Sequence, residues 1–152
     1  MDKKKIFSLL RRFNEIEKNK NTETPTLIDG RIPSFDPEES VMLLEYMKTI
    51  RNSFHFSERQ EYIDLAKDFL ADQITADDFS SDFISLYQGI EREVAQLEKD
   101  ESLELTNFLK TSQFELYDLL SQIYGTCDFF GHVIYDEKEL KDCAQILLLK
   151  LQ

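Results

Sequence analysis

Residues 62–83, YIDLAKDFLADQITADDFSSDF, contain the end of one amphipathic helix, a short break and the start of another. Apolar side chains recur every three or four residues on both sides of the break, which is the period of a helix with one buried face. At the break, Thr75 and Asp78 have the spacing of a capping box, in which each side chain bonds the other residue's backbone amide. The stretch therefore predicts two consecutive helices joined by a tight turn.

The same period extends in both directions along the chain and predicts an all-α protein with a single core, within 152 residues that contain only 4 glycines and 3 prolines. Residues 99–112 fit either a short helix or a packed loop. The other expected helices run from residue 3 to about 20, from a cap at 36 to about 52, from a cap at 57, from a cap at 75 through 97, over about 113–124, and through 140–151.

Two details of these helices are specific enough to check. In the second helix, the buried stripe is expected to include Val41, Leu44, Met47 and Ile50, widened by Met42, Leu43 and Tyr46. The third helix is expected to begin with a capping box formed by Ser57 and Gln60.

Charge is unevenly distributed along the chain. The formal net charge is −12, yet residues 1–20 have seven basic and three acidic residues, whereas residues 57–152 have eight basic and twenty-one acidic ones. An acidic surface of this kind repels phosphate, which argues against direct nucleic-acid binding. It would attract a basic protein partner. The alternative is that the acidity serves solubility alone. The basic first helix could contact a membrane or an acidic surface, or pack its apolar stripe on the core.

Motifs for catalysis, cofactors or metals do not stand out in the sequence. There is no phosphate-binding glycine loop, no nucleophile elbow and no paired-histidine spacing around the two histidines. Cys127 and Cys143 form no CxxC pair, and the N-terminus has too many charges for a secretion signal. These features predict a cytoplasmic, reduced protein that is not an enzyme and has no cofactor, metal site or membrane span.

Acidic residues are therefore the candidate binding residues. Asp77, Asp78 and Asp82 begin the fourth helix, although acids at a helix N-terminus also have a structural explanation in the helix dipole. The second set is Glu115 and Asp118 on one face of the fifth helix, with Asp128 just beyond that helix. Carboxylates spaced along a helix resemble a phosphodiester backbone, which a basic ribonuclease cleft is built to hold.

Several segments resemble the colicin D-type bacterial immunity proteins over about residues 57–152. They are IDLAK at 63–67, FLA at 69–71, ITA at 74–76 and FS at 79–80, followed by similar patterns at 114–120, 127–130 and 136–151. The resemblance implies an antiparallel four-helix bundle that inhibits a tRNA-cleaving toxin by occupying its catalytic groove. Glu115, Asp118 and Asp128 are the nearest matches to the acids that replace tRNA phosphates in that family.

Residues 1–56 lie outside this resemblance, and we expect them to be an N-terminal helical extension of the same domain. Two function classes remain from the sequence. One is an immunity protein whose partner is a cognate toxin nuclease domain, a basic protein. The other is a non-catalytic helical adaptor or regulator that binds a basic protein without inhibiting a nuclease.

Overall fold

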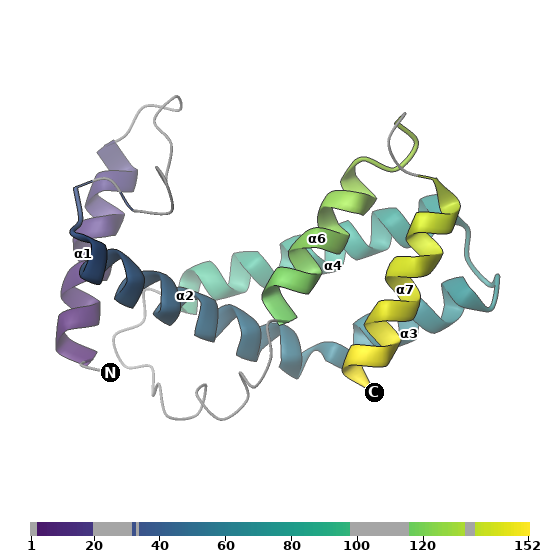
Figure 1. Ribbon diagram of the computed structural model, residues 1–152, viewed down its shortest axis with the longest axis horizontal. Coiled ribbons are helices and arrows are strands. Elements are labelled where there is room, and N and C mark those ends of the chain that lie inside the picture. The colour runs from purple at the N-terminus through teal and green to yellow at the C-terminus, as the bar shows by residue number, and fades with distance from the viewer. Residues whose placement is uncertain (1–2, 20–31, 33, 98–115, 133–135) are drawn as a thin grey trace.

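The computed structural model describes residues 3–19, 32, 34–97, 116–132 and 136–152, and their regular elements are helices, with no strand among them (Figure 1). The prediction of an all-α protein is confirmed for these residues. None of the described helices is both long and apolar enough to span a membrane. The helices are α1 (Lys3–Asn19), α2 (Pro37–Ser57), α3 (Arg59–Leu70), α4 (Ala76–Leu97), α6 (Leu116–Asp128) and α7 (Glu137–Leu151).

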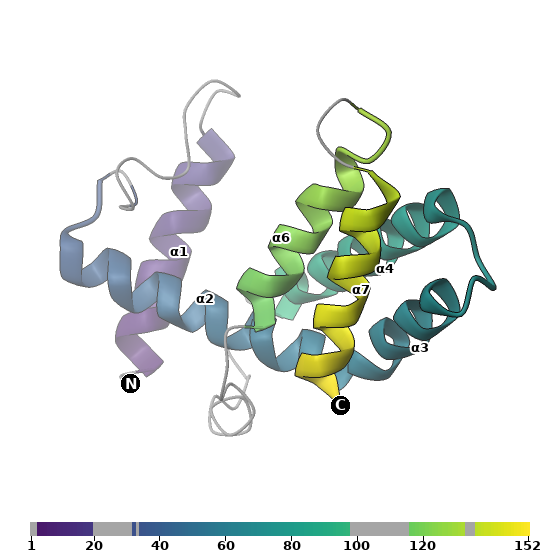
Figure 2. The ribbon, with the colours of Figure 1, turned by 45° about the vertical axis from the view of Figure 1, so that its right-hand side comes forward.

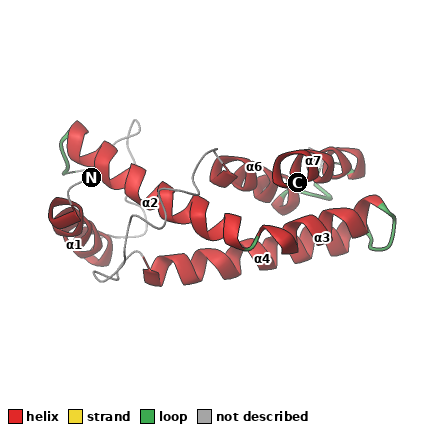
Figure 3. Ribbon diagram, turned by 90° about the horizontal axis from the view of Figure 1, so that it is seen from below, coloured by secondary structure: helices red, strands yellow, loops and turns green. Residues whose placement is uncertain are grey.

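Helix α2 contacts every other described helix except α7. At one end of the molecule α1 packs on α2 and on no other described helix (Figure 1). At the other end the chain turns back from α3 into α4, and both contact α2 (Figure 2). Helices α6 and α7 lie together over this α3–α4 pair, α6 against α4 and α7 against α3 (Figure 3). The division of the chain at residue 56 stays a prediction.

Helices α2, α4 and α7 begin with side-chain caps, and the caps of α2 and α4 are at the predicted residues. Asp36 accepts a 2.8 Å hydrogen bond from the backbone amide of Glu39, whose carboxylate accepts from the Asp36 amide in return. The same reciprocal arrangement begins α7. At α4, the amide of Thr75 donates to Asp78 and the amide of Asp78 donates to the Thr75 hydroxyl, both at 3.1 Å. The break inside residues 62–83 is thus confirmed as a capped helix start.

The predicted buried stripe of α2 is wrong at Val41, which is 55% exposed. Leu44 and Met47 are only partly buried against the core, and the fully buried apolar residues are Leu43, Tyr46 and Ile50. The buried face also includes polar residues, with Ser40 near the start of the helix and Asn52, Ser53 and His55 near its end. Apolar spacing alone therefore favoured the neighbouring face of the helix.

The predicted end of α2 and start of α3 are also wrong. Helix α2 continues to Ser57, and the Ser57 hydroxyl donates to the carbonyl oxygen of Phe54 at 2.7 Å. Glu58 is the N-cap of α3 and makes no side-chain capping bond, while Gln60 instead donates to Asp64. Since Glu58 also ends α2, its amide bonds back into that helix, so α3 begins almost as a continuation of α2.

The core of the α3–α4 pair is aromatic. The rings of Phe69 and Phe79 stack with centroids 4.5 Å apart, and those of Tyr62 and Phe83 lie 5.3 Å apart. All four side chains are at most 1% exposed. Helix α6 packs on α4 and reaches Asp128, four residues past its expected end, while its expected start at 113 lies outside the described residues.

Candidate functional site

The acids expected on the fifth helix do not form one cluster. Asp118 is in an ion pair with Lys48 of α2, with 2.7 Å between Oδ2 and Nζ, so its charge is already matched within the chain. Asp128 is exposed at the last residue of α6. Ten residues of helix separate the two, about 15 Å along the axis. Glu115, the third predicted residue, lies outside the described residues.

The acids expected at the start of α4 are exposed, but one of them takes part in the N-terminal cap of this helix. Asp77, Asp78 and Asp82 all lie on the solvent side of the first turns. Hydrogen bonds from the Thr75 hydroxyl and amide lower the pKa of the Asp78 carboxyl, so this residue is explained by the cap. Asp77 and Asp82 have no comparable structural role among the described residues.

A groove between α3 and α4 gathers acids that the sequence pattern does not single out. It has a volume of about 390 Å³. Glu58 and Glu61 come from the start of α3, and Glu93 comes from the second half of α4. The helices meet there because α4 folds back along α3, which a linear pattern does not reveal. The full lining is Glu58, Glu61, Ser85, Leu86, Gly89, Ile90 and Glu93.

The negative charge of this groove is not balanced by a basic lining residue. Neither of the two arginines nearest to it in sequence lines the groove. The Arg59 guanidinium lies 4.2 Å from the ring centroid of Phe56 and donates to the Phe56 carbonyl at 3.0 Å. Arg92 lines a different groove, beside Tyr87 and Tyr124 on the α6 side of α4. The side chains of Glu61 and Glu93 make no hydrogen bond or ion pair with another described residue.

Gly89 lies in the middle of α4 and lines the same groove. A Cβ atom added at this position would meet no atom within 4 Å. Packing therefore does not require glycine here, and glycine inside a helix is less stable than alanine by about 1 kcal/mol. The missing side chain leaves part of the α4 backbone exposed to the groove.

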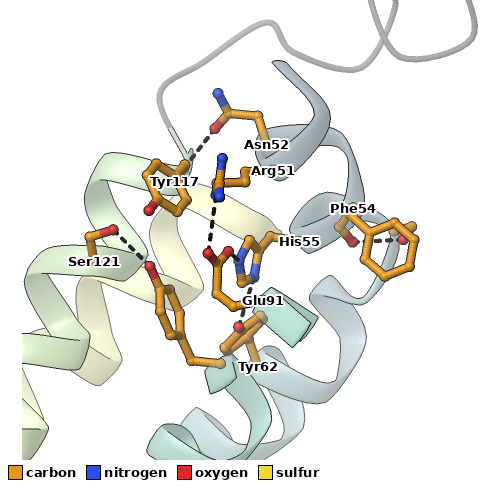
Figure 4. A network of polar contacts seen from close by, with 10 residues as sticks. Arg51, Asn52, Phe54, His55, Tyr62, Glu91, Tyr117 and Ser121 are labelled. Carbon is orange, nitrogen blue, oxygen red and sulfur yellow. Dashed lines mark hydrogen bonds and ion pairs between the residues drawn. The ribbon is translucent and has the colours of Figure 1, made fainter. Parts of the chain in front are cut away.

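A buried polar network lies inside the bundle next to the groove (Figure 4). The side chain of His55 is fully buried, with Nδ1 at 2.9 Å from the hydroxyl of Tyr62 and Nε2 at 2.9 Å from Oε1 of Glu91. The other oxygen of Glu91 accepts from Nε of Arg51 at 3.1 Å. The network joins α2, α3 and α4. The imidazole also stacks on Tyr87, with centroids 5.0 Å apart.

The electrostatics of this network favour a structural role. Burial alone would raise the pKa of Glu91, but the hydrogen bonds and charges of His55 and Arg51 outweigh it and lower that pKa. Burial strongly raises the pKa of Tyr62, which therefore stays a neutral phenol. Because the Tyr62 and His55 side chains are both 0% exposed, no substrate can reach them. The network fixes the helices that form the groove.

The described residues give little evidence of a nucleophilic cysteine or of a metal site. Burial raises the pKa of the Cys127 thiol to about 12, so Cys127 stays protonated at neutral pH. Cys143 is half-buried, and burial raises the pKa of its thiol as well. Within the described ranges, no group of three or more His, Cys, Asp or Glu residues could hold a metal ion.

Comparisons of the chain with protein-family models, with curated proteins and with solved structures gave no match. The resemblance to the colicin D-type immunity proteins consequently stays a hypothesis.

Proposed function

We propose that this chain is an immunity protein that binds a basic toxin nuclease and blocks its active-site groove. The observation that supports the proposal best is the concentration of negative charge on α3 and α4. Residues 57–97 contain ten acidic and three basic residues. The groove between these helices has three glutamates and no basic lining residue. A surface of this kind attracts a nuclease cleft that is positively charged for RNA.

Inhibition follows from rigidity and charge. Carboxylates held on packed helices would occupy the positions that RNA phosphates take in the toxin, so substrate and inhibitor compete for one cleft. Electrostatic attraction would also accelerate the encounter, and that acceleration weakens with added salt. The antiparallel four-helix arrangement of the family belongs to this proposal, with α3, α4, α6 and α7 as its four helices.

The test is affinity capture from the native cell lysate at low and high salt, with mass spectrometry of the bound protein, followed by a nuclease assay. We expect one basic polypeptide whose RNA cleavage ceases when the purified chain is added. A captured partner that has no nuclease activity, or whose activity the chain leaves unchanged, would overturn the proposal and favour the adaptor.

A further inference from the structure

The groove between α3 and α4 combines glutamates from both helices with apolar surface. Glu58 and Glu61 are one turn apart on α3, so their like charges repel each other mildly in the unbound protein. Glu93 faces them from α4, and Leu86 and Ile90 provide apolar surface between the two walls. A cation bound here would relieve the repulsion on the α3 wall.

The chemistry of the lining identifies the class of occupant. The carboxylates are not grouped closely enough to hold a metal ion. A volume of about 390 Å³ lies at the small end of ligand pockets, which suits one or two side chains rather than a whole helix. Lysine and arginine have an apolar stem and a charged end. Their stems match Leu86 and Ile90, and their charged ends match the glutamates.

Gly89 completes the argument because it keeps this groove open. Its position lacks a side chain although a Cβ would have space, and alanine would favour the helix. A residue this small at position 89 leaves the groove open to a partner side chain, whereas a larger side chain would fill it.

We infer that the groove lined by Glu58, Glu61, Gly89 and Glu93 is the docking site for an arginine- or lysine-bearing segment of the basic partner. This inference rests on the proposed function, and it places the contact on α3 and α4 rather than on the α6 face around Asp118. The reason for the difference is that Lys48 already pairs with Asp118, whereas the groove glutamates lack such a basic partner in the described chain.

The test uses the full chain and a fluorescein-labelled oligoarginine peptide at low salt. The groove variant is Glu61→Lys with Glu93→Lys, and its control is Glu45→Lys with Asp142→Lys, two exposed acids outside the groove. Both pairs change the net charge equally. We expect the groove pair to weaken peptide binding by about tenfold or more, and the control pair by only about twofold. An equal loss in both pairs would overturn the inference, because it would show attraction by net charge alone.

A second variant tests the groove without changing charge. Gly89→Leu places an alkyl side chain in the open space, and Gly89→Ala is its control. We expect the leucine to weaken peptide binding by about tenfold, and the alanine to leave it within about twofold. Backbone amide NMR should also place the peptide at Ser85, Leu86 and Gly89. Shifts centred on Asp118 and Asp128 instead would contradict the inference.

Nuclease inhibition separates this inference from the proposed function. If groove variants inhibit the captured toxin as well as the wild-type chain does, the docking site is wrong and the immunity function stands. If the wild-type chain inhibits no toxin while the peptide still binds the groove, the function is wrong and the docking site stands.

Discussion

Replacing His55 with phenylalanine should test whether the buried network stabilises the helices that form the groove. Phenylalanine keeps a ring beside Tyr87, where the imidazole now stacks at 5.0 Å. It removes both 2.9 Å hydrogen bonds of His55, one to Tyr62 and one to Glu91. A stranded buried polar group costs about 1–3 kcal/mol. Tyr62 would bear this cost fully because it is 0% exposed.

Glu91 adds a smaller loss, because its side chain is 23% exposed and it keeps its bond to Arg51. Together the two effects should lower the free energy of unfolding by about 2–3 kcal/mol. Urea unfolding followed by far-UV circular dichroism measures this difference. The native helical signal should be unchanged, because the ring still fills its place in the core.

A double-mutant cycle with Tyr62→Phe isolates the bond between the two side chains. Each single change strands the other partner, whereas the double change removes both polar groups. The double variant should therefore be more stable than the sum of the single losses predicts, by about 1–2 kcal/mol. Strictly additive losses would refute the reasoning, because they would mean that His55 and Tyr62 do not depend on each other.

Three further predictions concern single positions. Gly89→Ala should raise the free energy of unfolding by about 0.5–1 kcal/mol, because it removes a helix-interior glycine without a clash; a lower melting temperature would show that the space is filled. Thr75→Ala should lower the free energy of unfolding by about 1 kcal/mol because the α4 cap is lost, whereas Thr75→Ser should keep most of the capping contribution. Equal urea midpoints for the two variants would contradict the cap. The pKa of Glu91 is lower in the folded chain than its unfolded value of 4.5, so its contribution to stability is present above that pH and is lost as pH falls through the folded pKa. The free energy of unfolding should therefore fall less steeply with decreasing pH below 4.5 in Glu91→Gln than in the wild type. Identical slopes in the two proteins would exclude Glu91 as a contributor.

The sequence predicts features that depend on local chemistry. The starts of α2, α4 and α7 are encoded within four residues each, because a capping side chain bonds an amide three residues away. The stripes of α3 and α4 are also readable, because Tyr62, Phe69, Phe79 and Phe83 recur at the helical period and are buried. The buried face of α2 was only partly readable, since it also includes serines, an asparagine and a histidine.

The candidate site depends on contacts between distant residues, so the sequence could not predict it. His55 and Glu91 are separated by 36 residues, and their contact exists only because α4 folds back against α2. The groove likewise requires Glu61 and Glu93 to face each other across two helices. Conversely, Asp118 was selected for its charge, and no local pattern indicates that Lys48, 70 residues away, pairs with it.

The central claim is that this acidic helical protein inhibits a basic nuclease. Its most direct test is RNA cleavage by the captured toxin, measured while purified chain is added in increasing amounts. The account predicts that cleavage falls to background at one equivalent of chain, and that added salt restores it. Cleavage that continues unchanged at a large excess of chain would contradict the account.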